Sequence, residues 1–289
     1  MMGLRQALQQ AETARTGIGH FNVSDLVGLK AVFEAARDRR VPVVVGVSEG
    51  ERSFMGARQV AAWVSSLRDE YGLPIFLNAD HTHSIPSAVE AAKAGFDWVV
   101  FDASTLPFAD NVRQTKEAVE AVKAIRPDIL VEGEVGDIGT GSEIHADTPN
   151  VSGALTTAAE ARQFVEETQI DTFAPAVGNA HGLFQSMIDR GVKKRLNLER
   201  IREIKAAAHV YLTLHGASGT DEGDLRRSIN AGITVVHINT ELRVAWRRGL
   251  ESALASRPHE IVPYKLLPDV VASVKAVIDA RLSQISSPD

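Results

Sequence analysis

The feature that most constrains the fold of this chain is a regular alternation of short apolar segments with longer amphipathic ones. Eight segments of strand length are each followed by a segment with helical periodicity, at a spacing of roughly thirty residues. The run at 41–48 (VPVVVGVS) is almost continuously apolar, as expected for a strand that is buried on both faces. Alternation of this kind predicts a parallel sheet, and eight units predict a closed (β/α)8 TIM barrel of the α/β class.

The strands are predicted at 18–23, 41–48, 75–80, 97–102, 129–135, 172–177, 210–214 and 233–239. The helices are predicted at 24–40, 53–70, 86–94, 109–125, 156–168, 198–208, 221–231 and 241–255, with a first helix at 4–15 and a closing helix at 268–282. The first helix is expected to cap the bottom of the barrel. A doubly wound open sheet is the alternative, but no glycine-rich dinucleotide-binding fingerprint follows the first strand.

The length of 289 residues would suit two domains, yet α/β barrels often use such a length as one. We therefore expect a single barrel domain over 1–289, with a C-terminal helical extension at about 256–285. A long polar loop is predicted at 136–153, and loops of that length are usually functional lids or disordered segments.

Composition excludes several classes of function. The net charge is −6 and neither sign gathers in a block, which gives no footprint for nucleic acid or an anionic membrane. Cysteine is absent, so any transition-metal site must use the nine histidines and the carboxylates. The N-terminal residues carry charge too early for a signal peptide, and no window approaches a transmembrane span. We expect a cytoplasmic protein.

Three apolar runs end in histidine, in Asp80-His81, His181-Gly182 and His215-Gly216. In a barrel, polar residues at the carboxyl ends of strands belong to the active-site face. The candidates at these ends are Asp80, His81, Asp102, Glu134, His181 and His215. The sequence thereby predicts where its own site lies.

Three imidazoles and a water molecule suit a catalytic zinc ion. Each histidine alone could equally be a buried, hydrogen-bonded residue, but three of them at three strand ends favour a metal. Asp80 is a candidate general acid/base or a helix cap. Asp102 and Glu134 could bind a second cation, orient the histidines, or form a structural salt bridge. His20 and His237 lie within strands, where buried hydrogen bonding is the favoured interpretation and lining of the barrel the alternative.

An anion site is predicted next to the metal. Gly216-Ala-Ser218-Gly219 follows the seventh strand and Asn239-Thr240 follows the eighth, where many barrels bind phosphate. Backbone N–H groups and a hydroxyl at a helix start would surround the anion. The alternative is an ordinary turn with a serine or threonine cap.

With these motifs together, the chain resembles the class II, zinc-dependent fructose-bisphosphate and tagatose-bisphosphate aldolases from Phe21 to Lys265. No single motif is specific, but the set is. The motifs that carry the resemblance are Asp80-His81, Phe101-Asp102-Ala-Ser104, Pro107-Phe-Ala-Asp-Asn111, Glu132-Gly-Glu134-Val-Gly136, Gly178-Asn-Ala-His181-Gly182, His215-Gly-Ala-Ser218 and Asn239-Thr240-Glu241.

The resemblance implies a metal-dependent aldolase that reversibly cleaves a ketose (bis)phosphate, with fructose 1,6-bisphosphate as the leading substrate. The products would be dihydroxyacetone phosphate and glyceraldehyde 3-phosphate, formed through a zinc-stabilised enediolate. The partner is thus a small phosphorylated sugar, and the resemblance suggests a homodimer or homotetramer. No lysine on a predicted strand stands out for Schiff-base chemistry.

The resemblance also implies roles for individual residues. His81, His181 and His215 would bind one catalytic Zn²⁺, while Asp102 and Glu134 would serve a second divalent or monovalent cation. Asp80 would be the acid/base at the C4 hydroxyl, and Glu143, in the loop at 139–143, would be the acid of the lid. The residues implied in substrate binding are Asn22, Ser48, Gly182, Gly216, Ser218, His237, Asn239 and Thr240.

Three positions depart from the family pattern. Gln185 lies where the family usually has a lysine, and His237 where it has an asparagine. Tyr264-Lys265 falls where many members place an arginine for the far phosphate. These departures concern the sugar, so tagatose 1,6-bisphosphate or a related ketose phosphate is an alternative substrate. A metal-dependent barrel hydrolase with Asp80 as base, and a non-catalytic metabolite-binding barrel, are the other hypotheses.

Overall fold

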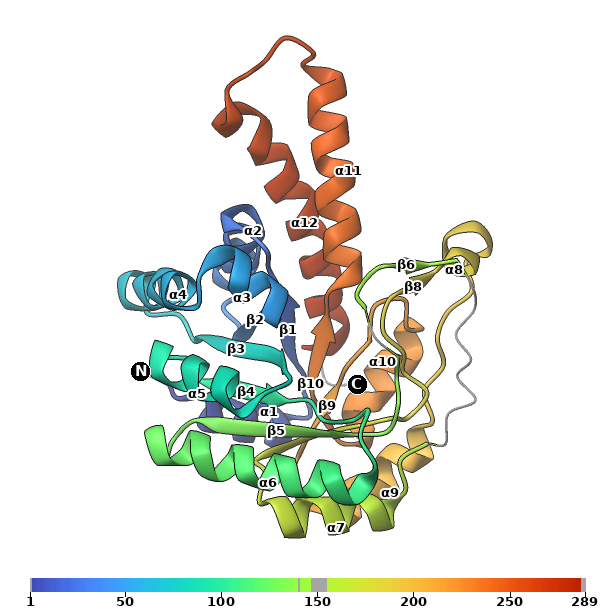
Figure 1. Cartoon of the computed structure of the whole chain (residues 1–289). Coiled ribbons are helices and arrows are strands. Elements are labelled where there is room, and N and C mark those ends of the chain that lie inside the picture. The colour runs from blue at the N-terminus through green and yellow to red at the C-terminus, as the bar shows by residue number, and fades with distance from the viewer. Residues whose placement is uncertain (1, 140, 147–154, 287–289) are drawn as a thin grey trace.

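The computed structural model describes residues 2–139, 141–146 and 155–286. In this part of the chain eight parallel strands close into a barrel in the order β1-β10-β9-β7-β5-β4-β3-β2 (Figure 1). The predicted barrel is therefore confirmed, and the open-sheet alternative was wrong. The barrel strands are β1 (Ile18–Asn22), β2 (Val43–Val47), β3 (Ile75–Thr82), β4 (Trp98–Phe101), β5 (Leu130–Val135), β7 (Thr172–Pro175), β9 (Tyr211–Leu214) and β10 (Ile233–Ile238).

Helices surround the barrel wall, and local sequence determines where they begin and end. Asp25 caps the first of them, because its side chain accepts a hydrogen bond from the Gly28 amide at 2.8 Å. Gly95 ends another in the left-handed conformation that glycine adopts easily. These wall helices are α2 (Leu26–Arg39), α3 (Glu49–Met55), α4 (Ala57–Tyr71), α5 (Ile85–Ala94), α6 (Phe108–Ile125), α7 (Ala158–Thr168), α9 (Leu198–Ala208) and α10 (Glu222–Ala231).

One predicted helix is two helices in the structure. The sequence predicts a single helix at 53–70, whereas the chain breaks between α3 and α4 at Gly56, which has φ +84. Ser48 starts α3 earlier than expected by forming a capping box with Glu51. The break matters because α3 then lies directly after β2, next to the mouth of the barrel.

The opposite end of the barrel is closed by α1 (Leu4–Ala14), as predicted. Its apolar face packs on residues near the amino ends of the strands and buries Leu8 completely, which contributes roughly 1.5–3 kcal/mol. This small core contains Leu4, Ala7, Leu8, Ala11, Ile18, Val44, Phe76, Trp98, Leu130 and Val235. This core fills the barrel at the amino ends of the strands.

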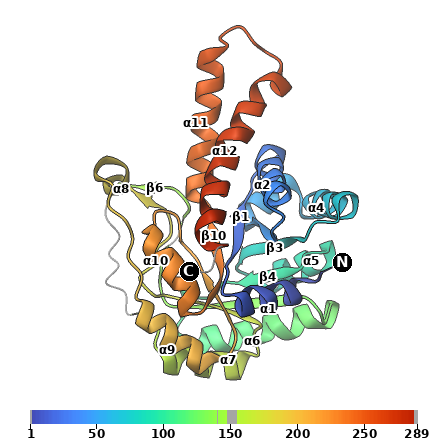
Figure 2. The ribbon, with the colours of Figure 1, turned by 180° about the vertical axis from the view of Figure 1, so that it is seen from behind.

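A helical hairpin of α11 (Thr240–Ser256) and α12 (Pro263–Ile285) extends beyond the barrel in both views (Figures 1 and 2). The last turn of α12 returns to the barrel, where the Gly17 amide donates to the Ile285 carbonyl oxygen at 2.6 Å. The loop between the two helices lies at the free tip. There Ile261 and Tyr264 are 87% and 76% exposed.

Two short strands, β6 (Ile144–His145) and β8 (Leu183–Phe184), pair outside the barrel, and α8 (Gln185–Arg190) follows them. The sequence did not predict them, because two-residue strands carry no periodicity. β6 lies within the predicted loop at 136–153, of which residues 140 and 147–154 are outside the described part. No helix that the structure describes is long and apolar enough to cross a membrane.

Candidate active site

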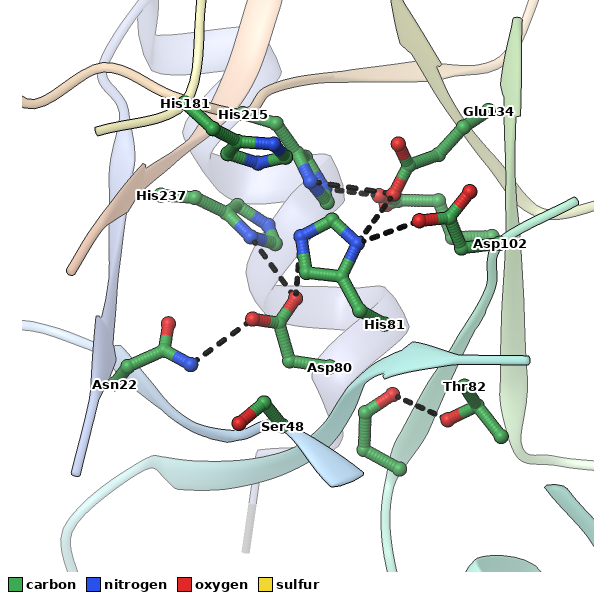
Figure 3. A network of polar contacts seen from close by, with 12 residues as sticks. Asn22, Ser48, Asp80, His81, Thr82, Asp102, Glu134, His181, His215 and His237 are labelled. Carbon is green, nitrogen blue, oxygen red and sulfur yellow. Dashed lines mark hydrogen bonds and ion pairs between the residues drawn. The ribbon is translucent and has the colours of Figure 1, made fainter. Parts of the chain in front are cut away.

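Asp80 and His81 are adjacent on β3, yet both line the cavity at the barrel mouth (Figure 3). On a regular strand adjacent side chains point to opposite faces. Here the register between β3 and β4 shifts between Ala79 and Thr82, and His81 has φ 41. A bulge of this kind redirects a side chain, and left-handed backbone at a residue with a Cβ is typical of functional sites.

Arg52 holds this bulge from α3. Its buried guanidinium donates to the carbonyl oxygens of Val47 and Asp80 at 2.8 and 3.2 Å and to the Thr82 hydroxyl at 3.0 Å. One arginine thus joins the ends of β2 and β3 directly beneath Asp80. Arg52 was not among the predicted site residues, because an arginine on a helix normally faces solvent.

Three predicted metal ligands converge at the mouth. His81, His181 and His215 each offer a ring nitrogen, and these nitrogens lie within 4.8 Å of one another. They come from β3 and from the loops that follow β7 and β9, so the barrel brings together residues far apart in the sequence (Figure 3). Such spacing suits three ligands around one metal ion.

The other nitrogen of each ring is held by an acceptor, which orients the ring. The pairs are His81 Nδ1 with Asp102 Oδ2 (2.9 Å), His215 Nε2 with Glu132 Oε1 (2.6 Å) and His181 Nδ1 with the Gly139 carbonyl oxygen (2.7 Å). This leaves Nε2 of His81 and His181 and Nδ1 of His215 toward the centre. Glu132 was not predicted as a site residue, although it shares a strand face with Glu134.

Unsatisfied buried atoms support a metal at this position. His215 Nδ1 and Glu134 Oε1 are buried and have no hydrogen-bond partner among the described residues. Glu134 Oε1 lies 3.3 Å from both His81 Nδ1 and His215 Nδ1, and with Asp102 and His81 it forms a second group of possible ligands. Buried polar atoms without partners are rare, so the donor set fits a divalent cation.

The pKa values of the site residues also support a bound metal ion. Burial opposes protonation of His215, but Glu134 and Glu132 outweigh it and raise the pKa to about 9. His81 has its pKa raised well above the ordinary value by Asp80 and Glu134, against the effect of burial. Burial and the nearby Asp102 raise the pKa of Glu134 to about 8. Without a metal these groups therefore carry protons, and a bound metal ion would displace those protons.

Asp80 is fixed as an ionised carboxylate. Asn22 Nδ2 donates to its Oδ2 at 2.9 Å, while its Oδ1 accepts no hydrogen bond in the described chain and faces His237 Nδ1 at 3.6 Å and His81 Nε2 at 4.0 Å (Figure 3). Burial would raise the pKa of Asp80, but neighbouring His81 and His237 hold it well below the usual value. One oxygen is thus held by a hydrogen bond, and the other, held only by longer ion-pair contacts, can accept a hydrogen bond from a ligand.

His237 lies in a column of three imidazoles. Its ring stacks on His20 with 3.6 Å between centroids and on His215 with 3.9 Å. The expected hydrogen bonding of His20 and His237 was wrong, because none of their ring nitrogens has a hydrogen-bond partner among the residues described, although His237 Nδ1 lies 3.6 Å from Asp80 Oδ1 as an ion pair. They line the barrel instead, and burial lowers the pKa of His20 to about 4. Gly46 makes room, since a Cβ there would lie 2.1 Å from His20 Cε1.

A small cavity beside the histidines collects the residues predicted to bind substrate. Thr240 begins α11 there, so the positive end of that helix dipole faces the cavity. Gly216 has φ +59, and a Cβ would lie 2.3 Å from the Ala180 carbonyl oxygen. The lining includes Asn22, Asp80, His81, His181, Gly182, His215, Gly216, Ser218, His237, Asn239 and Thr240.

A wider cavity of about 260 Å³ opens outward from Asp80 and His81. Ser48 lines it, and so does Arg243, which was not predicted. Arg243 Nη2 lies 2.8 Å from Glu51 Oε1, and its Nη1 donates to the Ser142 carbonyl oxygen at 3.0 Å. Glu143 is exposed and lines neither cavity in the described structure, although Ser142 beside it lines both.

A parallel barrel with three converging histidines and an ionised aspartate at its carboxyl mouth defines a metal-dependent barrel enzyme. The family model described as "Fructose-bisphosphate aldolase class-II" matches residues 2–289. The chain therefore belongs to the class II fructose-bisphosphate aldolase family, and it is a carbon–carbon lyase of that class. Aldolases of this class are metal-dependent.

Individual proteins agree with the family model. The chain is 31% identical over 290 residues to a Bacillus subtilis (strain 168) protein named "Probable fructose-bisphosphate aldolase", covering 99% of this chain and 98% of that protein. The solved structure of the YdjI aldolase from Escherichia coli K12 superposes with a TM-score of 0.80 at 27% identity, covering 99% and 97% of the two chains. A Campylobacter jejuni fructose-bisphosphate aldolase shares the fold, with a TM-score of 0.81 at 18% identity over 98% and 93%.

Proposed function

We propose that this enzyme cleaves a ketose bisphosphate reversibly into dihydroxyacetone phosphate and an aldehyde, and that its metal is zinc. Fructose 1,6-bisphosphate is the leading substrate, and tagatose 1,6-bisphosphate is the alternative. One observation supports this most: the three inward-facing imidazole rings, the carboxylate of Asp80 and the glycine loops after β7 and β9 meet around one cavity.

Zinc fits the donor set because three histidines bind it in many catalytic sites and leave a position open. Held by His81, His181 and His215, it would act as a Lewis acid on the ketone carbonyl of the substrate. Asp102 and Glu132 orient two of these rings through their second nitrogens. Glu134 and Asp102 remain the candidates for a second cation, because with His81 they form a separate group of close ligand atoms.

The glycine loops would hold the phosphate of the dihydroxyacetone half. Gly182, Gly216, Ser218 and Thr240 at the start of α11 all line the same cavity, and their N–H groups and hydroxyls would be the donors to the anion. A helix N-terminus and glycine-rich backbone favour a bound anion. This placement would set the C3–C4 bond of the sugar beside Asp80.

Asp80 would carry the proton transfer at C4. In cleavage its carboxylate accepts the C4 hydroxyl proton, the C4–O bond becomes the aldehyde carbonyl, and the C3–C4 electron pair stays on the dihydroxyacetone half. A proton delivered to C3 then completes dihydroxyacetone phosphate. Glu143 is the candidate donor, because the adjacent Ser142 already lines the cavity. Asn22 keeps Asp80 in position through its 2.9 Å hydrogen bond.

Arg243 is our candidate for the far end of the substrate. Among the described residues that line the wider cavity it is the sole lysine or arginine. Gln185 is exposed and donates to Asp189, and Tyr264 lies on the hairpin tip. A second phosphate would therefore meet Arg243, whose planar guanidinium suits a phosphate.

Assembly into a homodimer or homotetramer is also proposed. The hairpin of α11 and α12 exposes Leu254 (48%) together with Ile261 and Tyr264 at its free end. Exposed apolar residues that cluster on one projection are typical of an interaction surface. Sedimentation of the purified protein would measure the state directly.

The decisive experiment measures bound metal and then retro-aldol cleavage of fructose 1,6-bisphosphate, tagatose 1,6-bisphosphate and fructose 1-phosphate, with and without a chelator. We expect dihydroxyacetone phosphate to be released from at least one bisphosphate, to stop after chelation and to return with zinc. Absence of aldehyde release from every ketose phosphate, with zinc bound, would exclude the proposed reaction. Hydrolysis of an ester or amide by such a sample would instead indicate the barrel hydrolase.

A further inference from the structure

Lys194 lies in the segment between α8 and α9 and has an unusual environment. Its side chain is buried, and Nζ donates to the carbonyl oxygens of Ala180 (2.5 Å), Gly182 (2.6 Å), Gly216 (3.1 Å) and Ser218 (2.7 Å). An ammonium group has three N–H bonds, so four carbonyl oxygens exceed a one-to-one set of hydrogen bonds. A ring of backbone carbonyl oxygens is how proteins replace the hydration shell of an alkali-metal ion.

The four carbonyl groups belong to the two loops that form the candidate phosphate site. Ala180 and Gly182 flank His181 after β7, and Gly216 and Ser218 follow His215 after β9. Each loop thus turns two carbonyl oxygens toward the same nitrogen. Without a cation between them, these oxygens would repel one another and the loops would separate.

The main chain of Lys194 is itself fixed to the second loop. Its amide donates to the Gly219 carbonyl oxygen at 3.0 Å, and its carbonyl oxygen accepts from the Asp221 amide at 3.0 Å. Neighbouring Lys193 is exposed, and the side chain of Arg195 is 65% exposed and pairs with Asp224. Within this short basic run Lys194 alone turns inward.

The Lys194 ammonium has no carboxylate to neutralise it. It forms no salt bridge within the described part of the chain, and Glu241, the nearest acidic influence, is bound to Arg281 and to the Gly219 amide. Burial lowers the pKa of Lys194 to about 7, whereas the carbonyl oxygens favour its charged form. A buried positive charge without a salt-bridge partner raises the potential of the loops above it, which favours a phosphate dianion.

We propose that Lys194 is a built-in cation that fixes the two glycine loops in their phosphate-binding arrangement, so that phosphate binding needs no monovalent ion from solution. Lys194 is a positioning residue, because it acts through the loops and touches no substrate. The inference rests on the proposed function only in taking these loops as the phosphate site.

The test compares Lys194→Met, which removes the charge and keeps the chain length, with Lys193→Met as the matched exposed control. Binding of inorganic phosphate and of dihydroxyacetone phosphate to the zinc-loaded enzyme is measured by calorimetry. Tetramethylammonium is first the sole monovalent cation, and K⁺, Na⁺ or NH₄⁺ is then added. KM and kcat are measured under the same conditions.

We expect the wild type and Lys193→Met to bind phosphate equally well in every salt. Lys194→Met should keep its zinc and bind phosphate about tenfold more weakly or worse in tetramethylammonium, since buried carbonyl groups are left unpaired. NH₄⁺ or K⁺ should restore most of that loss, with KM rather than kcat following the change. Rescue by a cation is a result that a purely structural lysine would not give.

Three outcomes would overturn the inference: wild-type phosphate binding that requires K⁺, unchanged binding by Lys194→Met, or a loss that no cation relieves. If Lys194→Met does not fold, Lys194→Gln keeps two N–H donors without the charge and must show the same rescue. Phosphate binding is measured directly and does not depend on catalysis. If the wild-type enzyme binds phosphate without K⁺ but cleaves no ketose phosphate, the proposed function is refuted and this inference is not.

Discussion

The two sides of the barrel mouth are built in different ways. The metal side, made by β3, β5 and the residue that follows β4, uses side chains: its carboxylates are the buried Asp80, Glu132 and Glu134 and the partly buried Asp102. The anion side, made by the loops after β7 and β9 and the start of α11, uses main-chain groups around one buried ammonium. His181 and His215 come from the anion side and reach across to the metal side.

The difference teaches which changes each side can tolerate. On the metal side the chemistry is in the side chains, so replacing one removes a ligand or a proton acceptor. On the anion side the chemistry is in the backbone, so a substitution acts by displacing the loop, as a Cβ at Gly216 would. Substitutions on the metal side should therefore lower kcat and metal content, whereas substitutions on the anion side should weaken substrate binding.

The largest effect is expected from His81→Ala. Only His181 and His215 would remain of the three imidazoles, and bound zinc should fall below about 0.1 equivalents per chain, with activity lost. His83→Ala is the matched control, because His83 is an exposed neighbouring histidine that belongs to none of the described groups of possible metal ligands; its Nδ1 lies 3.1 Å from the Asp102 carbonyl oxygen. Elemental analysis of both variants checks this. Full zinc in His81→Ala would place the metal elsewhere.

Asp80→Asn should separate proton transfer from metal binding on the same side. The amide would keep the shape of the side chain but could not accept the C4 hydroxyl proton, so kcat should fall about 10²–10⁴-fold with zinc retained. Steady-state kinetics and metal content are measured on one preparation. A variant that instead lost its zinc would show that Asp80 is structural.

Metal affinity should depend on pH with a definite sign. The pKa of His215 is raised to about 9 and that of His81 is raised well above its ordinary value, so both rings hold protons at neutral pH without metal. Zinc must displace these protons, and its apparent affinity should rise at least about tenfold per pH unit between about pH 6 and 8. Competition with a chelator of known affinity measures the slope. An apparent zinc affinity that does not change with pH would contradict the protonation of His81 and His215 in the metal-free enzyme.

Gly216→Ala tests the anion side. The new Cβ would lie 2.3 Å from the Ala180 carbonyl oxygen at a residue with φ +59, so the loop must move. We expect KM to rise about tenfold while zinc stays bound, with a loss of stability of about 1–3 kcal/mol. Gly50→Ala is the control, because Gly50 lies in α3 with nothing within 4 Å of an added Cβ. If kcat fell and KM did not, the contrast between the two sides would be wrong.

The smallest effect is expected from Arg243→Ala. Its loss should raise KM for a bisphosphate about tenfold, and less for fructose 1-phosphate, which lacks the far phosphate. Arg247→Ala is matched, since Arg247 lies one turn further along α11 and pairs with Glu251 on the surface. Equal effects on both substrates would remove Arg243 from substrate recognition.

The sequence by itself determined the barrel and most of the metal side. Eight apolar runs at regular spacing carry the fold, and histidines and acids at the ends of those runs are visible because strand ends of a parallel barrel must meet at one mouth. Predicted residues such as His81, His181 and His215 come together for that reason.

Only the tertiary structure decided how these residues face one another. The bulge at His81 directs the side chains of Asp80 and His81 into the same cavity, and no local sequence pattern predicts this bulge. Glu132 meets His215 across 83 positions, because β5 and β9 lie on either side of β7 in the closed barrel. Lys194 stands in a basic run that resembles a solvated surface, and its partners are carbonyl oxygens, which every residue has. Main-chain N–H and carbonyl groups are nearly the same in every residue, so the sequence does not show which of them will form a site. The main-chain contacts of the anion side could therefore be recognised only from the tertiary structure.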